Sequence, residues 1–193
     1  MSLFKPSDLK KEKPVAEVIK AVRTSEKIHM VIGKANQKLE EVIGTINQGE
    51  CISYSSYGDW STHDLLFYLL QTTGPAKVYF TTWAISEYAV RQLYNFIQEG
   101  HILELYGIFD YRNGVRKPAE LQFLQQITTN IKPAKCHAKV TCIMNDSWAI
   151  AIVGSANYTR NPRIEAGDIH TDPKVAEHHR YWIMKELNEQ SVF

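Results

Sequence analysis

The chain has 193 residues and a mass of 22.1 kDa, and 44% of its residues are hydrophobic. This size and apolar content suit one domain with a single substantial core. The 22 Lys and Arg residues nearly balance the 21 Asp and Glu residues. The charge balance excludes a global basic field that would attract nucleic acid, so any nucleic-acid site must be a local patch.

The cysteines and the N-terminal residues indicate a cytoplasmic protein. Cys51, Cys136 and Cys142 have no metal-ligand spacing, and free cysteines in strands behave as small hydrophobic residues. The first residues, MSLFKPSDLKKEKP, contain no apolar run of signal-peptide length. The chain contains no uninterrupted membrane-spanning stretch. We therefore expect a reducing compartment, no membrane insertion and no cofactor.

Residues 1–50 are interpreted as an N-terminal extension. Lys27–Ile32 is a possible strand. A short amphipathic helix follows, with Asn36 as a possible N-cap and Gly49 beyond its end. Its apolar residues recur at helical spacing at Leu39, Val42, Ile43 and Ile46. We expect this helix to pack on the core.

From Cys51 onward, strand patterns alternate with helix patterns. Strands are predicted at Cys51–Tyr57, Lys77–Trp83 and Ile102–Asp110. Helices are predicted from the Ser61 cap to Gln71, from Ser86 to Glu99 before Gly100, at Ala119–Thr128, and at Pro173–Glu189. This order predicts an α/β domain over residues 51–193, with a mixed, largely parallel β-sheet sandwiched by helices.

A β-hairpin is predicted to join the sheet at its end, between the third and the last of these helices. Its strands are Val140–Met144 and Trp148–Val153, and Asn145 to Ser147 form the turn. His137 and Lys139 lie two residues apart at the head of the first strand, so their side chains point to the same face. A two-residue turn places His137 opposite Gly154, and a turn one residue wider places it opposite Ser155.

Either register gathers groups that suit a phosphate. Gly154 lets a ligand approach the backbone closely, and Lys139 supplies a fixed positive charge. Ser155 offers a hydroxyl group and Asn157 offers an amide. An imidazole beside them can attack phosphorus when a second group orients its other nitrogen. His137 is the candidate nucleophile, and Glu165 is the candidate for the orienting group.

This pattern, His137-x-Lys139 followed by Gly154-Ser155-x-Asn157 and Glu165, resembles the HKD signature of the phospholipase D superfamily. The resemblance implies a phospholipase D-like single lobe whose C-terminal hairpin carries the motif. It also implies a metal-independent phosphodiesterase with a phosphohistidine intermediate on His137.

By position, the resemblance gives the remaining site residues their roles. Lys139, Ser155 and Asn157 hold the phosphate, and Glu165 orients the histidine. The sequence departs from the family at one position, because the mainly structural aspartate five residues after the lysine is here Met144. The nearest aspartate is Asp146, in the predicted turn.

The chain contains a single His-x-Lys pair, whereas the family's chemistry uses two histidines across one phosphate. We therefore expect a homodimer with the active site at its interface, as in the family's small bacterial endonucleases. The leading hypothesis is a nuclease that cleaves nucleic acid. Phospholipid headgroup hydrolysis or transfer, and a catalytically silent nucleic-acid-binding protein, are the alternatives.

Further residues can be read as substrate contacts or as structural. Arg160 and Arg163 follow the motif and could position a phosphodiester backbone. Arg112, Arg116 and Lys117 lie in a predicted loop and are equally well explained as solvated charges. Aromatic residues near strand ends could stack on bases or pack in the core, namely Tyr54, Tyr57, Trp60 and Trp83. His170, His178 and His179 lack metal-ligand spacing and are assigned to the surface.

Overall fold

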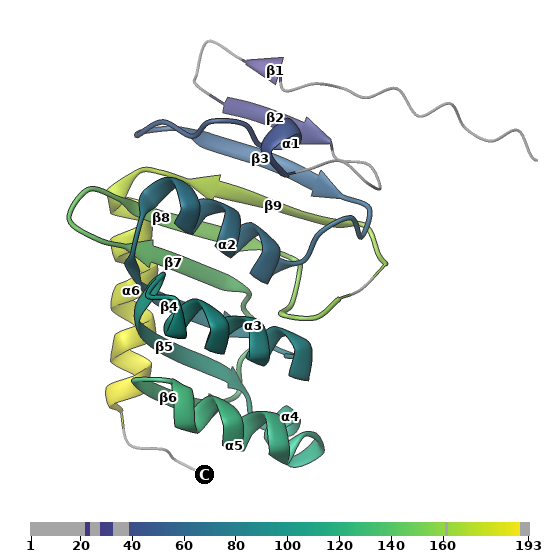
Figure 1. Ribbon diagram of the computed structural model, residues 1–193, viewed down its shortest axis with the longest axis vertical. Coiled ribbons are helices and arrows are strands. Elements are labelled where there is room, and N and C mark those ends of the chain that lie inside the picture. The colour runs from purple at the N-terminus through teal and green to yellow at the C-terminus, as the bar shows by residue number, and fades with distance from the viewer. Residues whose placement is uncertain (1–21, 24–27, 33–38, 161, 190–193) are drawn as a thin grey trace, which may run out of the picture.

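The computed structural model describes residues 22–23, 28–32, 39–160 and 162–189, which fold into one mixed sheet with helices on both faces (Figure 1). In these ranges the sheet has nine strands in the order β1-β2-β3-β9-β8-β7-β4-β5-β6. The strands are β1 (Val22–Arg23), β2 (Ile28–Ile32), β3 (Cys51–Ser56), β4 (Ala76–Thr82), β5 (Ile102–Asp110), β6 (Asn130–Ala134), β7 (Val140–Met144), β8 (Ala149–Gly154) and β9 (Glu165–His170). The helices are α1 (Leu39–Val42), α2 (Thr62–Thr73), α3 (Glu87–Gln98), α4 (Tyr111–Arg116), α5 (Pro118–Ile127) and α6 (Pro173–Asn188).

The sheet separates two hydrophobic cores. Helices α2, α3 and α5 cover one face and α6 covers the other (Figure 1). Strand β7 serves both cores, because Ile143 belongs to the first buried cluster while Val140 and Cys142 belong to the second. The predicted alternation of side chains along this strand is therefore confirmed.

The predicted helix caps are present. The Ser61 hydroxyl accepts a hydrogen bond from the Asp64 amide, and the Asp64 carboxylate accepts one from the Ser61 amide, which completes a capping box. Ser86 caps α3 by accepting from the Ala89 amide. These caps fix where α2 and α3 begin. Both helices begin on the side of the sheet where β3 and β4 end.

The prediction of a largely parallel sheet is wrong. Of the eight strand pairings in the described residues, three are parallel and five are antiparallel. Helical crossovers make β4, β5 and β6 parallel neighbours. The β7–β8 hairpin and β9 are inserted between β3 and β4, where they pair antiparallel on both sides. The hairpin therefore lies in the middle of the sheet and not at its end.

Strand β9 was not predicted from sequence. Its sequence, EAGDIH, contains Gly167 and Asp168, which disfavour strands, and only Ile169 in it is buried. Pairing with β3 on one side and β8 on the other supplies the hydrogen bonds that override this low propensity. Strand β6 and helix α4 were also missed. Pro133 is tolerated in β6 because β6 is an edge strand.

Near the N-terminus, β2 pairs in parallel with β3, in agreement with the strand expected there. Helix α1 is shorter than its apolar pattern predicted, because Gly44 adopts a positive φ of 69° directly after it. Ile43 and Ile46 are nevertheless buried in the core that α2 and α3 cover. The predicted cap Asn36 and residue Lys27 lie outside the described residues.

Gly167 lies at a point of close contact between β3, β8 and β9. A Cβ atom at this position would lie 2.8 Å from the Tyr54 hydroxyl and 2.8 Å from the Val153 carbonyl oxygen. We expect Gly167→Ala to lower the free energy of unfolding by about 1–3 kcal/mol, because the rigid strand neighbours must move. Denaturant unfolding measures the change. Ala166→Ser, at the exposed neighbouring position, is the control. Equal stability of the two variants would contradict the close contact assigned to Gly167.

Candidate active site

Strand ends meet at one edge of the sheet, which is the right-hand edge in Figure 1. Thr81 near the end of β4 pairs with Val140 at the start of β7. Gly154 at the end of β8 pairs with Gly167 in β9, and Ser56 at the end of β3 pairs with Glu165. The topology therefore brings the two halves of the sequence motif to the same edge.

His137 and Lys139 lie in the segment that leads into β7. The Lys139 Nζ lies 3.2 Å from His137 Nδ1 and donates a hydrogen bond of 2.7 Å to the His137 carbonyl oxygen. His137 is exposed, and its ring centroid lies 6.0 Å from that of Trp83. The predicted proximity of the imidazole and the ammonium group is confirmed.

The hairpin register differs from both registers considered from sequence. Val140 pairs with Val153 and Met144 with Ala149, so the turn contains four residues. The Asn145 Oδ1 stabilises this turn by accepting from the Ser147 and Trp148 amides at 3.0 and 2.8 Å. His137 therefore lies opposite neither Gly154 nor Ser155. Instead, the Gly154 amide donates to the Lys139 carbonyl oxygen at 3.2 Å.

Two buried residues that sequence reasoning missed fix the segment that bears the histidine. The Thr81 Oγ1 lies 3.2 Å from the Ala138 carbonyl oxygen, to which it donates, and 3.2 Å from the Val140 amide, from which it accepts. The Asp110 carboxylate accepts from the Cys136 amide, and its bonds with Arg112 lower the Asp110 pKa. Polar residues at the carboxyl ends of two predicted strands were the available signal.

Ser155 and Glu165 form a second contact pair in the site. The Ser155 hydroxyl donates to the Glu165 carboxylate, and the Ala166 amide donates to the Ser155 Oγ at 3.0 Å. In this structure the carboxylate of Glu165 thus contacts the serine, while the contacts of His137 are to Lys139 and Trp83. The half-buried Glu165 is still close enough to act on the charge of Lys139.

The charge of Lys139 is partly desolvated. Burial lowers the pKa of Lys139, and Cys136 and Glu165 oppose this effect by favouring the charged form. An ammonium group with fewer water contacts interacts more strongly with an anion than a fully hydrated one does. This edge of the sheet therefore offers an anion a cation whose charge is only partly screened.

The side chain of Asn157 is anchored to the chain that follows β4. Its Oδ1 accepts from the Thr82 hydroxyl, the Trp83 amide and the Ala84 amide, each at 3.2 Å. Since the oxygen is fully used, the amide NH₂ is the group that can donate to a ligand. The Asn157 carbonyl oxygen is also held, by the Thr62 hydroxyl at the start of α2.

Gly154 is required for close packing between β8 and β9. A Cβ atom there would lie 2.9 Å from the Ala166 carbonyl oxygen. The Tyr54 ring lies over Gly167 and its hydroxyl reaches the Gly154 position, so Tyr54 is a buried residue beneath the site. Burial raises the pKa of Tyr54, which keeps its phenol neutral.

The remaining candidates are divided between the site and the surface. Arg160 is exposed and its guanidinium lies 4.5 Å above the Tyr88 ring centroid, while Arg163 is exposed in the same loop. Arg112 is paired with Asp110, as expected for a structural charge. Asp146 is exposed in the hairpin turn, at the opposite end of β7 from His137.

Within the described ranges, no group of three or more His, Cys, Asp and Glu side chains is arranged to hold a metal ion. Of the helices in the described part of the chain, none combines the length and apolar character that crossing a bilayer requires.

The solved structures that share this fold include two bacterial proteins. Nuc from Salmonella typhimurium, a phospholipase D family member, aligns with a TM-score of 0.53 and 14% identity over 70% of this chain and 93% of Nuc. NucT from Helicobacter pylori aligns with a TM-score of 0.51 and 16% identity over 70% of this chain and 95% of NucT. No protein-family model matches the chain, and no curated protein matches it significantly. The phospholipase D-like α/β fold that the HKD resemblance implied is therefore confirmed, but the predicted place of the motif hairpin at the end of the sheet is not.

Substitution of Asn157 tests whether the loop after β8 depends on its hydrogen bonds to the chain at the end of β4. We expect Asn157→Ala to lower the free energy of unfolding by about 1–3 kcal/mol, because the Trp83 and Ala84 amides lose this acceptor. Asn157→Asp retains an acceptor oxygen and should lose less stability. Thermal and denaturant unfolding of both variants check the order, and equal losses would contradict the assigned role of Oδ1.

Proposed function

We propose that this chain, which has the fold of the phospholipase D family member Nuc, is a phosphodiesterase that cleaves nucleic acid without a metal ion. The observation that carries the proposal is the gathering of His137, Lys139, Ser155 and Asn157 at one edge of the sheet. A nucleophile, a cation and two hydrogen-bond donors there provide the groups that phosphoryl transfer needs.

Phosphate binding is the first proposed step. The Lys139 ammonium and the Asn157 amide NH₂ donate to the non-bridging oxygens of the phosphodiester. The Ser155 hydroxyl, which donates to Glu165 in the free protein, can turn to the phosphate when a negative oxygen is present. These donors neutralise the charge that develops on phosphorus-bound oxygens in the transition state.

Substrate binding also changes the state of His137. Lysine can only donate, so the contact between its Nζ and His137 Nδ1 favours a lone pair on Nδ1 and a proton on Nε2. A phosphate anion is a stronger partner for the ammonium group than a neutral imidazole is. Movement of Lys139 to the phosphate leaves Nδ1 able to take the proton, and Nε2 then carries the attacking lone pair.

The chemical step is an in-line displacement at phosphorus. A bond forms between His137 Nε2 and phosphorus while the bond to the leaving oxygen breaks, which gives a phosphohistidine and an alkoxide. An acid protonates that alkoxide. Water then attacks the phosphohistidine, releases the phosphate monoester and restores the imidazole. Glu165 is proposed to stabilise the positively charged ring in this cycle.

The acid that protonates the leaving group is proposed to be the same histidine of a second copy of the chain. His137 is exposed at the edge of the sheet, so a twofold axis beside it can bring two imidazoles to one phosphate. A homodimer with the active site at its interface follows from this arrangement.

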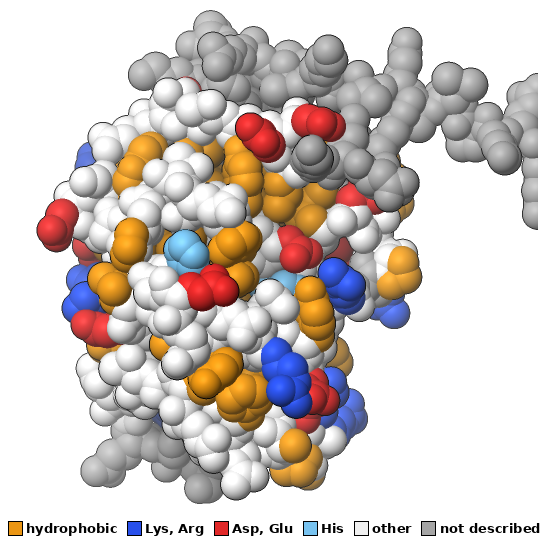
Figure 2. All heavy atoms as spheres, in the orientation of Figure 1, with side chains coloured by type: hydrophobic (Ala, Val, Ile, Leu, Met, Phe, Trp, Pro, Cys, Tyr) orange, Lys and Arg blue, Asp and Glu red, His pale blue; other side chains and the backbone are white. Residues whose placement is uncertain are grey.

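Nucleic acid is the proposed substrate because further groups beside the site suit it. Arg160 and Arg163 supply positive charge near the loop that carries Asn157. Charge is otherwise mixed on the face viewed in Figure 2, where acidic side chains are interspersed with basic ones. A local contact with the phosphodiester backbone is the form of binding that this distribution supports.

A second candidate function is a nucleic-acid-binding protein that retains the phosphate pocket without turnover. One observation favours it, namely that the carboxylate of Glu165 is bound to Ser155 and that His137 contacts a lysine. A histidine without an orienting acid is a weaker nucleophile. This candidate predicts binding of nucleic acid without cleavage.

The first test compares cleavage of plasmid and single-stranded DNA in excess chelator by the wild type, His137→Ala and His178→Ala. We expect His137→Ala to lower the cleavage rate by about 10³-fold or more, because the nucleophile is lost. His178→Ala, an exposed change on α6, is the matched control and should cleave like the wild type. Salt-sensitive DNA binding by a wild type that does not cleave would favour the second candidate.

The shared active site predicts a distinct result for mixed dimers. A dimer of one wild-type and one His137→Ala subunit, purified through two different affinity tags, should be as inactive as the doubly substituted dimer. Two independent sites would instead retain about half of the wild-type rate. Sedimentation of the wild type should give a dimer, and a monomer that remains active would contradict the two-histidine mechanism.

A further inference from the structure

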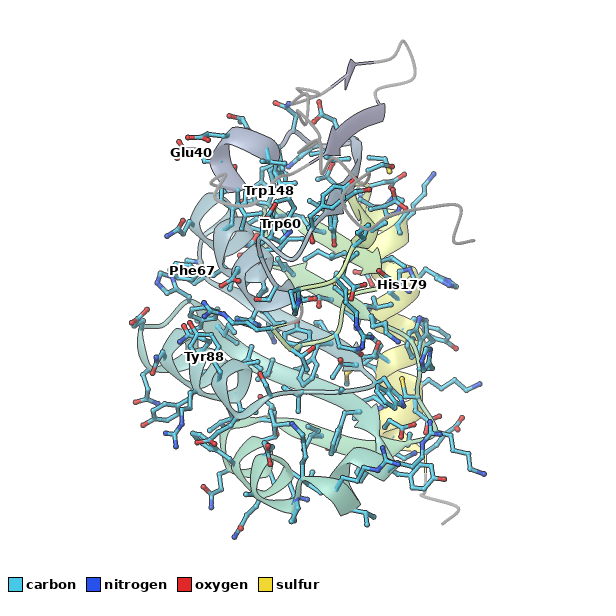
Figure 3. The ribbon with its side chains drawn as sticks, turned by 90° about the vertical axis from the view of Figure 1, so that its right-hand side faces the viewer. Glu40, Trp60, Phe67, Tyr88, Trp148 and His179 are labelled. Atoms are coloured by element: carbon cyan, nitrogen blue, oxygen red, sulfur yellow. The ribbon has the colours of Figure 1, made fainter. Side chains whose placement is uncertain are left out.

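A cavity of about 300 Å³ lies beside the candidate site. It is bounded by the loop between β3 and α2, which contributes Asp59, Trp60 and Ser61, and by the loop after β8, which contributes Arg160. Trp60 and Tyr88 mark the neighbouring elements in Figure 3, on the side of the sheet opposite His179 of α6. The sequence motif uses none of the residues of the β3–α2 loop.

The walls of the cavity are joined to the proposed phosphate site by direct contacts. The Trp60 ring lies 6.3 Å from the ring of Tyr54, which packs beneath Gly154. The Thr62 hydroxyl, next to Ser61, bonds to the Ala156 and Asn157 carbonyl oxygens. A nucleotide whose phosphate lies near Ser155 and Asn157 could therefore place its base in this cavity.

Asp59 is the unexplained group in this cavity. Its Oδ2 is buried, and it has no hydrogen-bond partner among the residues that the structure describes. Burial raises the pKa of Asp59, because water is removed from its carboxylate. The neighbouring Asp64 is already used, since its carboxylate accepts from the Ser61 amide and hydroxyl. Because Oδ2 is closed to solvent in the free protein, a ligand in the cavity supplies the missing donor once the carboxylate turns toward it.

Arg160 provides the opposite charge at the rim of the same cavity. Its guanidinium carbon lies 4.5 Å from the Tyr88 ring centroid, in a cation–π contact, and one of its nitrogens lies 3.5 Å from the Tyr88 hydroxyl. Tyr88 thus holds a donor group at the rim of the cavity that the Asp59 carboxylate also lines. Trp60 adds an aromatic wall that packs on the core.

We propose that this cavity binds a guanine base of the substrate, next to the phosphodiester that is cleaved. The proposal rests on the proposed function, since the ligand is part of the same nucleic-acid strand. Guanine carries two adjacent N–H donors, N1–H and N2–H, which match the two oxygens of the Asp59 carboxylate. Its O6 acceptor on the same edge matches the Arg160 guanidinium.

Other bases match this cavity less well. Adenine and cytosine each offer a single exocyclic amino group beside an acceptor nitrogen, which would face a carboxylate unfavourably. Uracil and thymine have one ring N–H between two carbonyl groups. The volume is at the lower end of ligand cavities, which suits one base that stacks on an aromatic wall.

The test is an equilibrium titration of the protein with GMP, AMP, CMP and UMP, in which calorimetry measures the binding. We expect the wild type to bind GMP at least about tenfold more tightly than the other three nucleotides. Asp59→Asn should remove this preference, because an amide offers one acceptor and not two. Arg160→Gln is an independent variant that should weaken it. Asp146→Asn, an exposed change in the hairpin turn, is the matched control and should retain it.

The result separates this inference from the proposed function. His137→Ala should lose cleavage and keep the GMP preference, since the histidine lies outside the cavity. Equal binding of the four nucleotides, absence of saturable binding, or an unchanged preference in both Asp59→Asn and Arg160→Gln would overturn the guanine assignment. Each of these results leaves the cleavage assay to decide the phosphodiesterase proposal.

Discussion

The carboxyl end of β4 holds both halves of the candidate site. Thr81 fixes the backbone around Ala138, between the histidine and the lysine, through one hydroxyl group. The next residues of the chain donate to the side chain of Asn157 and so fix the loop after β8. The distance between the His137 segment and Asn157 is therefore set by a single strand end. Loss of either anchor would separate the residues to which we assign the proposed chemistry.

The locally determined parts of this arrangement could be predicted from sequence. The side chains of β7 alternate between two cores as its apolar pattern predicted. Ser61 and Ser86 cap their helices because capping depends on residues within three positions of each other. The pairing of His137 with Lys139 is also local. Such features follow from neighbours in the chain, so no knowledge of the fold was needed.

The non-local parts could not be predicted in the same way. The hairpin register depended on a side-chain turn formed by Asn145, and a count of turn residues does not reveal it. Strand β9 has a poor strand sequence and exists because two other strands pair with it. The contact of Glu165 with Ser155 follows from that pairing, since it lies at the start of β9. The family resemblance identified Ser155 and Glu165 as candidates, while the strand pairing determines that they contact each other.

The position of β9 has a consequence for how the protein acquires its structure. Strands β3 and β4 are consecutive in sequence, yet three strands from the last third of the chain separate them. Ser53 and Asp168, which bond across β3 and β9, are 115 residues apart. Until β7, β8 and β9 arrive, two long edges of the sheet stay open to pairing with other chains. Pairings between strands this far apart in sequence form slowly, so we expect the candidate site to assemble late in folding.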